Sequence, residues 1–354
     1  MISKGIESGQ FMSFLQCDQA SIGTFLFTLS LIGAIINIPC FYSLPSDSII
    51  LKMTWRYLIL IIMLIPKIFF DVAAIGDRIY EILNPSNLFY LLFLAFLNTI
   101  WVYLFYLAAS HTFSAHTMLL QLPMLFLTLW KLLRRELLTY LELIGIGITV
   151  FGAYLITNDG ETLDRKDILI GNLISIGSSI IGAIYIYLSQ PIVNKSIPAS
   201  IYLGITGIGL IIFSFLFASF LGEKISFAST DSNNGVFGIF ATTENLIYGF
   251  IGLGVMSGFT LTYFPIKASE YISPMFMNTT FNCAPFLSQL VCYVLGVQGF
   301  PGNFTAFGGF WLFIGCTLLT MSYEDHNDLA KKFPVSGVIF NSKIVEKSSH
   351  QEKV

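Results

Sequence analysis

Residues 108–157 read AASHTFSAHTMLLQLPMLFLTLWKLLRRELLTYLELIGIGITVFGAYLIT, and this stretch decides the fold class. Two apolar runs lie on either side of a short basic segment, Lys131-Leu-Leu-Arg134-Arg135-Glu136. Each run has about the 20 residues that an α-helix needs to cross a bilayer. A soluble helical hairpin would keep a polar face along both helices, and this stretch has none. The stretch therefore predicts two membrane spans, with three cations between them at one lipid–water interface.

The composition of the whole chain leads to the same prediction. Of the 354 residues, 55% are hydrophobic and only 11% are charged, and the mean hydropathy is +0.76. Soluble globular domains have about 25% charged residues, so lipid must cover much of this surface. The charges lie in connections and in the C-terminal tail rather than in a basic stripe, which excludes nucleic acid as a partner. We predict an all-α integral membrane protein.

Apolar runs of about 20 residues predict ten membrane-spanning helices. They fall near 21–43, 50–70, 86–108, 112–132, 137–157, 168–188, 199–221, 245–266, 269–295 and 303–322. Ten crossings return the chain to its starting side, and Lys and Arg are more frequent in the connections on that side. Both termini are therefore predicted to be cytoplasmic. Plasma membrane and endomembrane are both compatible with the sequence, which has no retrieval or prenylation signal.

The ten spans divide into two sets of five. The first set covers 21–157 and the second covers 168–322, with an acidic connection at 158–167. Residues 1–20 form an N-terminal cytoplasmic segment, and the charged tail 323–354 is predicted to be disordered. Because five is odd, the second set enters the membrane from the opposite side. Such an inverted-topology repeat is typical of secondary transporters, whose solute site lies between the halves near the midplane.

Glycines recur at the same place in both sets. Gly145 and Gly152 are seven residues apart in the fifth span, and Gly308 and Gly315 are seven apart in the tenth. A step of seven residues returns to the same helix face, so each pair allows a neighbouring helix to approach closely.

The basic turn and its flanks resemble a known family. Arg135-Glu-Leu-Leu-Thr-Tyr-Leu-Glu-Leu-Ile-Gly145 is similar to the turn G-E-R-L-T-P-L-Q-x-x-G of the EamA-type branch of the drug/metabolite transporter superfamily. Glu136 falls on the glutamate of that pattern, Gly145 on its closing glycine, and Gly152 on the next family glycine. Arg135 replaces the first glycine of the pattern, and the second set of spans lacks the glutamate. The resemblance implies a ten-helix transporter of small metabolites that works by alternating access, with the turn residues in structural roles.

Weaker likenesses to the same family lie at Trp55–Tyr57, Ser114–Pro123 and Gly171–Asn172.

Polar side chains inside the spans are candidates for a solute cavity, because hydrocarbon tolerates them only beside a partner or water. In the ninth span they share one helical face at Asn278, Asn282, Pro285 and Gln289. In the fourth span they share a face at Ser110, Ser114, Thr117, Gln121 and Thr128. The alternative is that these groups bond neighbouring helices to one another. Asn282 and Gln289 are the least expected in that role.

Two further cavity candidates are Asn98 in the third span and Tyr185 in the sixth. Other aromatic residues of these spans could add stacking surfaces, although aromatic side chains in membrane proteins more often anchor the interfaces. Asn37 and Pro39 are interpreted as marking a break in the first span, where backbone groups could bind a ligand.

Titratable residues give few candidates for ion coupling. His116 and Glu270 are the two, although Glu270 is more simply paired with Lys267 at the interface. Arg56 lies near the outer start of the second span, where snorkelling to the headgroups is expected. No Lys or Arg is then predicted at mid-membrane depth, which disfavours phosphate-bearing solutes. A neutral or zwitterionic metabolite is favoured.

Two other functions stay open. An endomembrane nucleotide-sugar exchanger would need a cation in the cavity, so that Lys267 or Arg56 would have to lie deeper than predicted. A non-transporting scaffold with the same fold would pack its polar stripes against each other. Enzyme activity is not expected, since no catalytic motif is present. No cofactor or metal is predicted, and the expected partners are a small-molecule solute and the lipid bilayer, with a homodimer also compatible.

Overall fold

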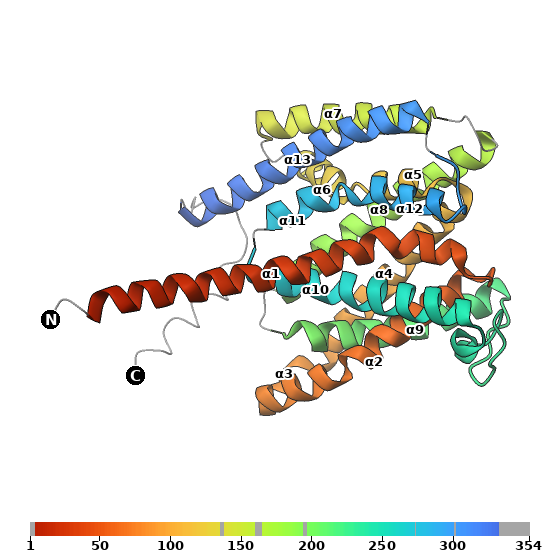
Figure 1. Cartoon of the computed structure of the whole chain (residues 1–354), viewed down its shortest axis with the longest axis horizontal. Helices are drawn as coiled ribbons and strands as arrows, with labels where there is room; N and C mark the ends of the chain where they lie inside the picture. Colours follow the sequence, from red (N-terminus) through yellow and green to blue (C-terminus); the bar gives the residue numbers. More distant parts are fainter. Residues whose placement is uncertain are drawn as a thin grey trace.

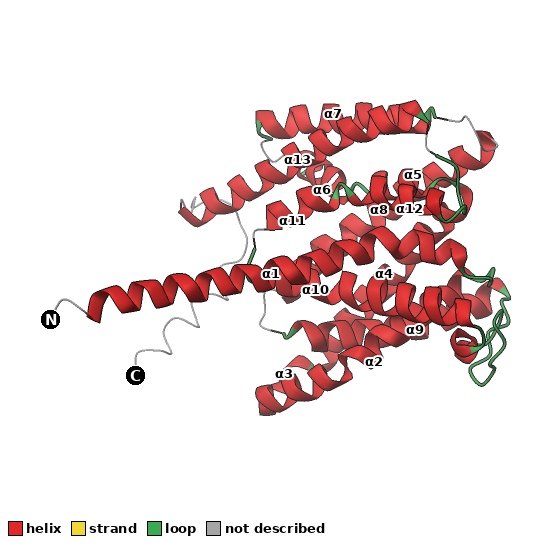
Figure 2. Ribbon diagram, viewed as in Figure 1, coloured by secondary structure: helices red, strands yellow, loops and turns green. Residues whose placement is uncertain are grey.

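The computed structural model describes the backbone of residues 4–134, 138–159, 165–193, 197–272, 274–300 and 302–332. Side chains are described over the same ranges except for 4–20, 165–166, 190–193, 274–275, 278–279 and 323–332. Over these ranges the structure is helical, with a single isolated β-bridge between Ser226 and Gly235. Figure 2 shows helices throughout the bundle and no strand in the described chain.

The helices of the first part of the chain are α1 (Lys4–Ser43), α2 (Ile49–Ile75), η1 (Gly76–Arg78), α3 (Ile79–Ile82), α4 (Pro85–His111), α5 (Ser114–Leu119), α6 (Pro123–Leu133) and α7 (Tyr140–Thr157). Those of the second part are α8 (Arg165–Val193), α9 (Ala199–Leu221), η2 (Val236–Phe240), η3 (Asn245–Thr260), α10 (Leu261–Ala268), α11 (Pro274–Phe281), α12 (Ala284–Val294) and α13 (Asn303–Lys332). The segment η3 has the wide turn of a π-helix and continues directly into α10.

The protein is an integral, multi-pass membrane protein. Within the described ranges, nine helical stretches are long and apolar enough to cross a membrane. Their outward faces carry large apolar side chains that water would not accommodate in such numbers. On α7 alone these exposed residues are Tyr140, Leu141, Leu143, Ile144, Val150, Phe151 and Tyr154.

The ninth predicted span, 269–295, is not one helix. The chain forms α11 up to Phe281, breaks at Asn282 and Cys283, and starts again as α12 at Ala284. Pro285 occupies the first turn of α12, where its missing N–H costs nothing, and it cannot continue the ladder of α11. The single polar face predicted for this span is therefore divided between two short helices.

The fourth predicted span, 112–132, is interrupted in the same way. It consists of α5 and α6, with Leu120–Leu122 between them and Pro123 in the first turn of α6. The predicted polar face is divided here too, since Ser110 belongs to α4 and Gln121 lies in the break.

The first span, by contrast, has no break. The helix α1 runs without interruption from Lys4 to Ser43, with Pro39 inside it, so the break predicted at Asn37 and Pro39 is wrong. At the other end of the chain, α13 continues to Lys332. The first ten residues of the predicted disordered tail are therefore helical.

Figure 1 shows α7 and α13 running side by side as an outer layer of the bundle. Their contact lies at the four glycines. A Cβ on Gly152 would lie 2.7 Å from the carbonyl oxygen of Gly308, and one on Gly145 would lie 3.2 Å from that of Gly315. Side chains at these positions would force the two helices apart, so the glycines set their separation.

The remaining long helices form the body of the bundle. In it α4 packs on α8, α1 on η3, and α2 on both α9 and η3. The largest core cluster lies among these helices and includes the fully buried Trp55, Leu60, Leu91 and Tyr106. This cluster surrounds the region in which a solute site is predicted.

The connection between α9 and η3 covers one end of the bundle. The indole Nε1 of Trp55 donates to the carbonyl oxygen of Val236 at 2.9 Å, and the side chains of Val236 and Ile239 are buried. The N-terminal end of α1 and the C-terminal end of α13 both project from the opposite end (Figure 1). The two ends of the bundle therefore differ, and only one is covered by this connection.

Candidate solute-binding cavity

A cavity of about 460 Å³ lies inside the body of the bundle, between α1, α2, α4, α8, α9 and α10. We call it the polar lobe, because amides, hydroxyls and one guanidinium group line it. The lining side chains with polar groups are Asn37, Arg56, Tyr57, Asn98, Trp101, Gln121, Tyr185, Ser189, Tyr202, Thr206 and Thr262. Its volume is within the usual range for small-molecule sites.

The polar lobe extends toward the end of the bundle from which α1 projects. Ser189 near the end of α8, Tyr202 near the start of α9 and Ile266 near the end of α10 all line it. Arg56 lies toward the other end, seven residues after the start of α2, which places it about 10 Å along the helix.

Arg56 is held by three other helices. Its Nη1 donates to the hydroxyl of Tyr106 at 2.8 Å, and its Nη2 donates to the carbonyl oxygen of Ser257 at 3.2 Å. The hydroxyls of Tyr106 and Ser257 both donate to Oδ1 of Asn37 at 2.6 Å. A closed set of hydrogen bonds thus fixes the guanidinium against the wall of the cavity.

The prediction that Arg56 snorkels to the headgroups is wrong. Its exposed fraction is 7%, because α1, α4 and η3 enclose it. Of its donors, Nε is buried and has no hydrogen-bond partner. Among the described residues, no carboxylate oxygen lies within 4.0 Å of the guanidinium. Arg56 is therefore a buried cation that the described chain does not neutralise, which is costly unless a ligand supplies the charge.

Aromatic side chains form another part of the lining of the polar lobe. The rings of Trp101 and Tyr185 are 5.6 Å apart at an angle of 39°, and the hydroxyls of Tyr185 and Tyr202 are 2.7 Å apart. Asn98 lies on α4, one turn before Trp101. Of the predicted cavity residues, Asn98, Gln121 and Tyr185 therefore line this lobe. Apolar ring faces and a cation in one cavity suit a solute with both an anionic and a planar or apolar part.

A second cavity of about 390 Å³ adjoins the first, and we call it the apolar lobe. Trp101, Gln121 and Leu261 line both lobes. Between the lobes, Nε1 of Trp101 donates to Oε1 of Gln121 at 3.0 Å. Asn282 lines the apolar lobe from the break between α11 and α12, and its Nδ2 is buried without a partner.

Two predicted cavity residues line neither lobe. Gln289 accepts from the N–H of Ala115 at 2.9 Å and donates to the carbonyl oxygen of Gly299 at 2.8 Å, so it bonds α12 to α5 and to the following loop. The expectation that Gln289 is unsuited to bonding between helices is wrong. The hydroxyl of Thr117 donates to the carbonyl oxygen of Phe113 within its own turn. The side chain of Asn278 lies outside the described residues.

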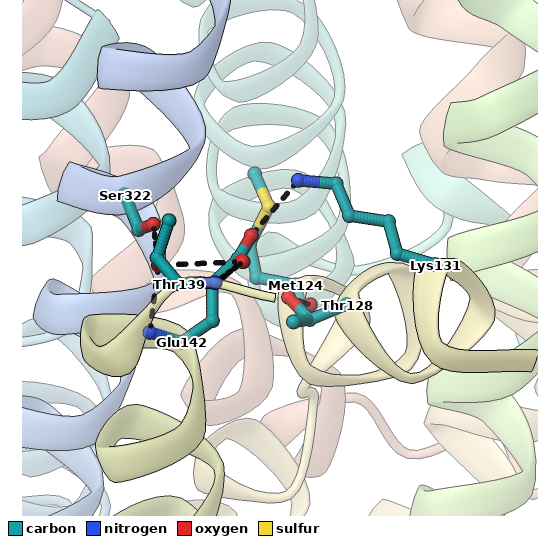
Figure 3. Close-up of polar contacts among 6 residues, drawn as sticks. All are labelled: Met124, Thr128, Lys131, Thr139, Glu142 and Ser322. Atoms are coloured by element: carbon teal, nitrogen blue, oxygen red, sulfur yellow. Dashed lines mark hydrogen bonds and ion pairs between the residues drawn. The ribbon is translucent and has the colours of Figure 1, made fainter. Parts of the chain in front are cut away.

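The first turn of α7, directly after the basic turn, contains a buried carboxylate that the sequence analysis did not predict. Glu136, predicted as the structural glutamate of the basic turn, lies outside the described residues. Glu142 in α7 is 1% exposed and accepts from Nζ of Lys131 at 2.9 Å and from the N–H of Thr139 at 2.8 Å. The Thr139 hydroxyl accepts from the Glu142 N–H and lies 2.6 Å from the Ser322 hydroxyl (Figure 3). The pattern Thr139-x-x-Glu142 is a capping box, a signal that the sequence contains.

The two predicted coupling residues lie in different surroundings. His116 is fully buried, with Nε2 2.6 Å from the Thr305 hydroxyl, which donates in turn to Asp159. Glu270 is exposed and pairs with Lys267 at 2.7 Å, at the end of α10. Neither residue lines the lobes. Among the described residues, no three His, Cys, Asp or Glu side chains are grouped to hold a metal ion.

The comparisons with known proteins concern only the fold. No family model matches the chain, and no curated protein matches it. Twelve chains of solved structures match. One of them, described only as "Crystal structure of protein", has a TM-score of 0.54 and 16% sequence identity, over 86% of this chain and 98% of that chain. The two share a fold across almost all of the solved chain, and at this identity the likeness carries no information on activity.

Proposed function

We propose that this protein is a transporter that moves a small organic solute through the polar lobe by alternating access. Arg56 is the observation that carries the proposal. A buried guanidinium with an unpartnered Nε and no described counter-ion is costly, and an anionic ligand bound for part of a cycle would offset that cost. The solute class that we propose is an organic anion or zwitterion with a carboxylate or phosphate group. Of the neutral or zwitterionic solutes that the sequence favours, this proposal keeps the zwitterions and replaces the neutral solutes by organic anions, because the sequence analysis assumed that no cation reaches this depth.

The packing of the helices supports a 5+5 inverted repeat. We match the membrane spans of the two halves in order, which pairs α1 with α8, α2 with α9, α4 with η3, α5 with α11, α6 with α12 and α7 with α13. The contact of α4 with α8 then corresponds to that of η3 with α1. In the same matching, the contact of α2 with η3 corresponds to that of α9 with α4. The contacts of α7 with α13 and of α2 with α9 each join two equivalent helices, so exchanging the halves leaves them unchanged. Such exchange symmetry is expected of two equivalent halves, and it supports the proposed membership of the EamA-type branch.

The broken helices support a site between these halves. In the same matching, α5 and α6 correspond to α11 and α12, and each pair is interrupted beside a proline. Interrupted helices at corresponding positions of two repeats are the sequence feature that best indicates a transport site. Gln121 and Asn282, which lie in the two breaks, both line the apolar lobe.

The proposal is tested first by ligand-dependent thermal stability of the full chain in detergent. A panel of amino acids, carboxylates, sugar phosphates, nucleosides and polyamines should give stabilisation by the anionic and zwitterionic members only. A ligand at 100 times its Kd stabilises by about 2.7 kcal/mol. In Arg56→Gln the affinity should fall at least tenfold, because a hydrogen-bonded charge contributes about 1.5–3 kcal/mol. Uptake into proteoliposomes should fall in parallel.

Arg78→Gln is the matched control, because it removes the same charge from an exposed side chain outside the cavity. Arg56→Lys separates charge from geometry, since lysine lacks the planar fork. Equal binding and uptake in Arg56→Gln and Arg78→Gln would overturn the proposal.

A nucleotide-sugar exchanger is the second candidate. Arg56 provides the cavity cation that this function requires, and Tyr57, Trp101 and Tyr185 offer faces on which a base could stack. Stabilisation by nucleotide sugars, and by no simple carboxylate or sugar phosphate, would select this candidate.

A further inference from the structure

The two lobes differ in the polar side chains that line them, whereas apolar surface predominates in both. The apolar lobe is enclosed mainly by aliphatic, aromatic and thioether side chains, among them Ala34, Met118, Phe281, Leu312 and Phe313. Its amide side chains are those of Gln121 and Asn282. Arg56 and the three tyrosines are confined to the polar lobe. An anionic group and an apolar group would therefore partition to opposite lobes, since burying apolar surface is favourable only away from water.

The lobes adjoin along α1. Ala34 lines the apolar lobe and Asn37 lines the polar lobe, three residues apart on neighbouring positions of one helix face. Three residues rise about 4.5 Å along a helix, which is less than the length of a short organic solute. One molecule is therefore long enough to reach both lobes once the side chains between them move aside.

The wall between the lobes is a pair of side chains rather than backbone. Trp101 lies flat over Gly182 of α8, where a Cβ would be 2.7 Å from its Cε2. Its Nε1 is bonded to Gln121, whose Nε2 donates to the Ser178 hydroxyl at 3.1 Å. Because these are side chains, the wall can change without movement of the helices, since side-chain rotamers exchange far faster than helices move.

Asn282 is one of the two amide side chains that line the apolar lobe. Its Nδ2 is buried and has no hydrogen-bond partner. A buried amide donor without an acceptor loses its hydration without compensation, and a hydrogen bond to an oxygen atom of a solute would offset that loss. A lobe lined by apolar groups with one convergent donor is a typical small-molecule subsite.

We propose that the transported solute is an amphipathic organic anion that occupies both lobes. Its carboxylate or phosphate binds Arg56, its apolar chain or ring fills the apolar lobe, and Nδ2 of Asn282 donates to an oxygen in that part. This inference rests on the proposed function and adds to it the class of solute.

The test is a homologous series of monocarboxylates, butyrate, hexanoate and octanoate, measured by thermal shift on the full chain in one detergent. Each methylene buried in the apolar lobe should lower Kd about fourfold until the lobe is full. In Ala34→Phe the ring would fill part of the lobe, so the ratio of Kd for butyrate to Kd for octanoate should fall toward 1. Ala306→Phe is the matched control on an exposed face of α13 and should keep the ratio of the unaltered chain.

Asn282→Leu provides a second test that adds no bulk. In the unaltered chain 7-oxo-octanoate should bind more tightly than octanoate, because its keto oxygen would accept from Nδ2 of Asn282. Asn282→Leu should remove this difference in Kd and keep the dependence of Kd on chain length. Cys283→Leu, at an exposed neighbouring residue, should keep both.

The outcomes separate the two proposals. Anion binding that needs Arg56 but does not depend on chain length, or that keeps its chain-length dependence in Ala34→Phe, overturns the two-lobe inference and leaves transport standing. Tighter binding of nucleotide sugars than of any alkyl carboxylate, unchanged by Ala34→Phe, also overturns it. Loss of the dependence on Arg56 overturns the proposed function itself.

Discussion

The start of α7 at Glu142 and the cavity wall at Arg56 each bury one charged side chain, and they differ in whether that charge has an oppositely charged partner. Glu142 is paired with Lys131 and bonded to the Thr139 N–H, within a capping box. Arg56 has only neutral partners in the described chain, and its Nε has none. Removing one partner of a buried ion pair is costly, whereas removing an unpaired buried charge is not. Stability should therefore depend on Glu142, and binding on Arg56.

The largest effect on stability is expected for Glu142→Ala. It removes the Lys131 ion pair and the capping box of α7, and the free energy of unfolding should fall by about 2–3 kcal/mol. Thermal unfolding in detergent measures this. Glu81→Ala, at an exposed acidic residue, is the control and should change little. Equal melting temperatures for the two variants would contradict the structural role of Glu142.

Gly258→Ala should act on Arg56 through the backbone. A Cβ on Gly258 would lie 2.6 Å from the carbonyl oxygen of Arg56, so η3 or α2 must shift. Overpacking of this kind costs about 1–3 kcal/mol. We expect a lower melting temperature together with weaker anion binding. Gly147→Ala is the control, because a Cβ there meets nothing within 4 Å. Unchanged anion affinity in Gly258→Ala would show that the position of Arg56 does not depend on this contact.

Arg56→Met should leave stability within about 1 kcal/mol of the unaltered protein, or raise it. The loss of two hydrogen bonds is offset because an unpaired cation no longer has to be desolvated. The thermal unfolding used for Glu142→Ala measures this directly. A fall as large as that of Glu142→Ala would mean that Arg56 is a structural residue, and the comparison between the two sites would fail.

Lys267→Ala is expected to have the smallest effect on both the free energy of unfolding and uptake. The ion pair with Glu270 is exposed, and such pairs contribute about 1 kcal/mol or less. Any change in uptake should disappear at high ionic strength, because salt screens exposed charges. An effect that persists in 1 M salt would place Lys267 in the solute path.

The sequence predicted those features that depend on local pattern. Apolar runs located the long helices, such as Ala199–Leu221, to within a few residues of their ends. The step of seven residues between Gly145 and Gly152 predicted the close approach of a neighbouring helix, because the step alone puts both glycines on one face. The structure identifies that neighbour as α13.

The features that the sequence did not predict depend on tertiary neighbours. Nothing local distinguishes Pro39, which α1 accommodates, from Pro285, beside which the ninth span breaks. Arg56 was placed at the interface from its distance to the start of its helix. Its burial results from Tyr106 and Ser257, which are 50 and 201 residues away in the sequence. Gln289 and Asn282 look alike in sequence, and only the packing leaves one satisfied and the other not.

The length of α1 has a practical consequence for determining the orientation of the protein. Its 40 residues extend for about 60 Å, twice the thickness of a hydrocarbon core. If the first membrane span begins near residue 21, as the sequence predicts, the preceding residues 4–20 add about 25 Å of helix beyond it. A fluorophore at its tip would be far enough from the bilayer surface for an impermeant quencher to reach it from one side only. Quenching of such a fluorophore in intact vesicles would therefore determine on which side of the membrane the N-terminus lies.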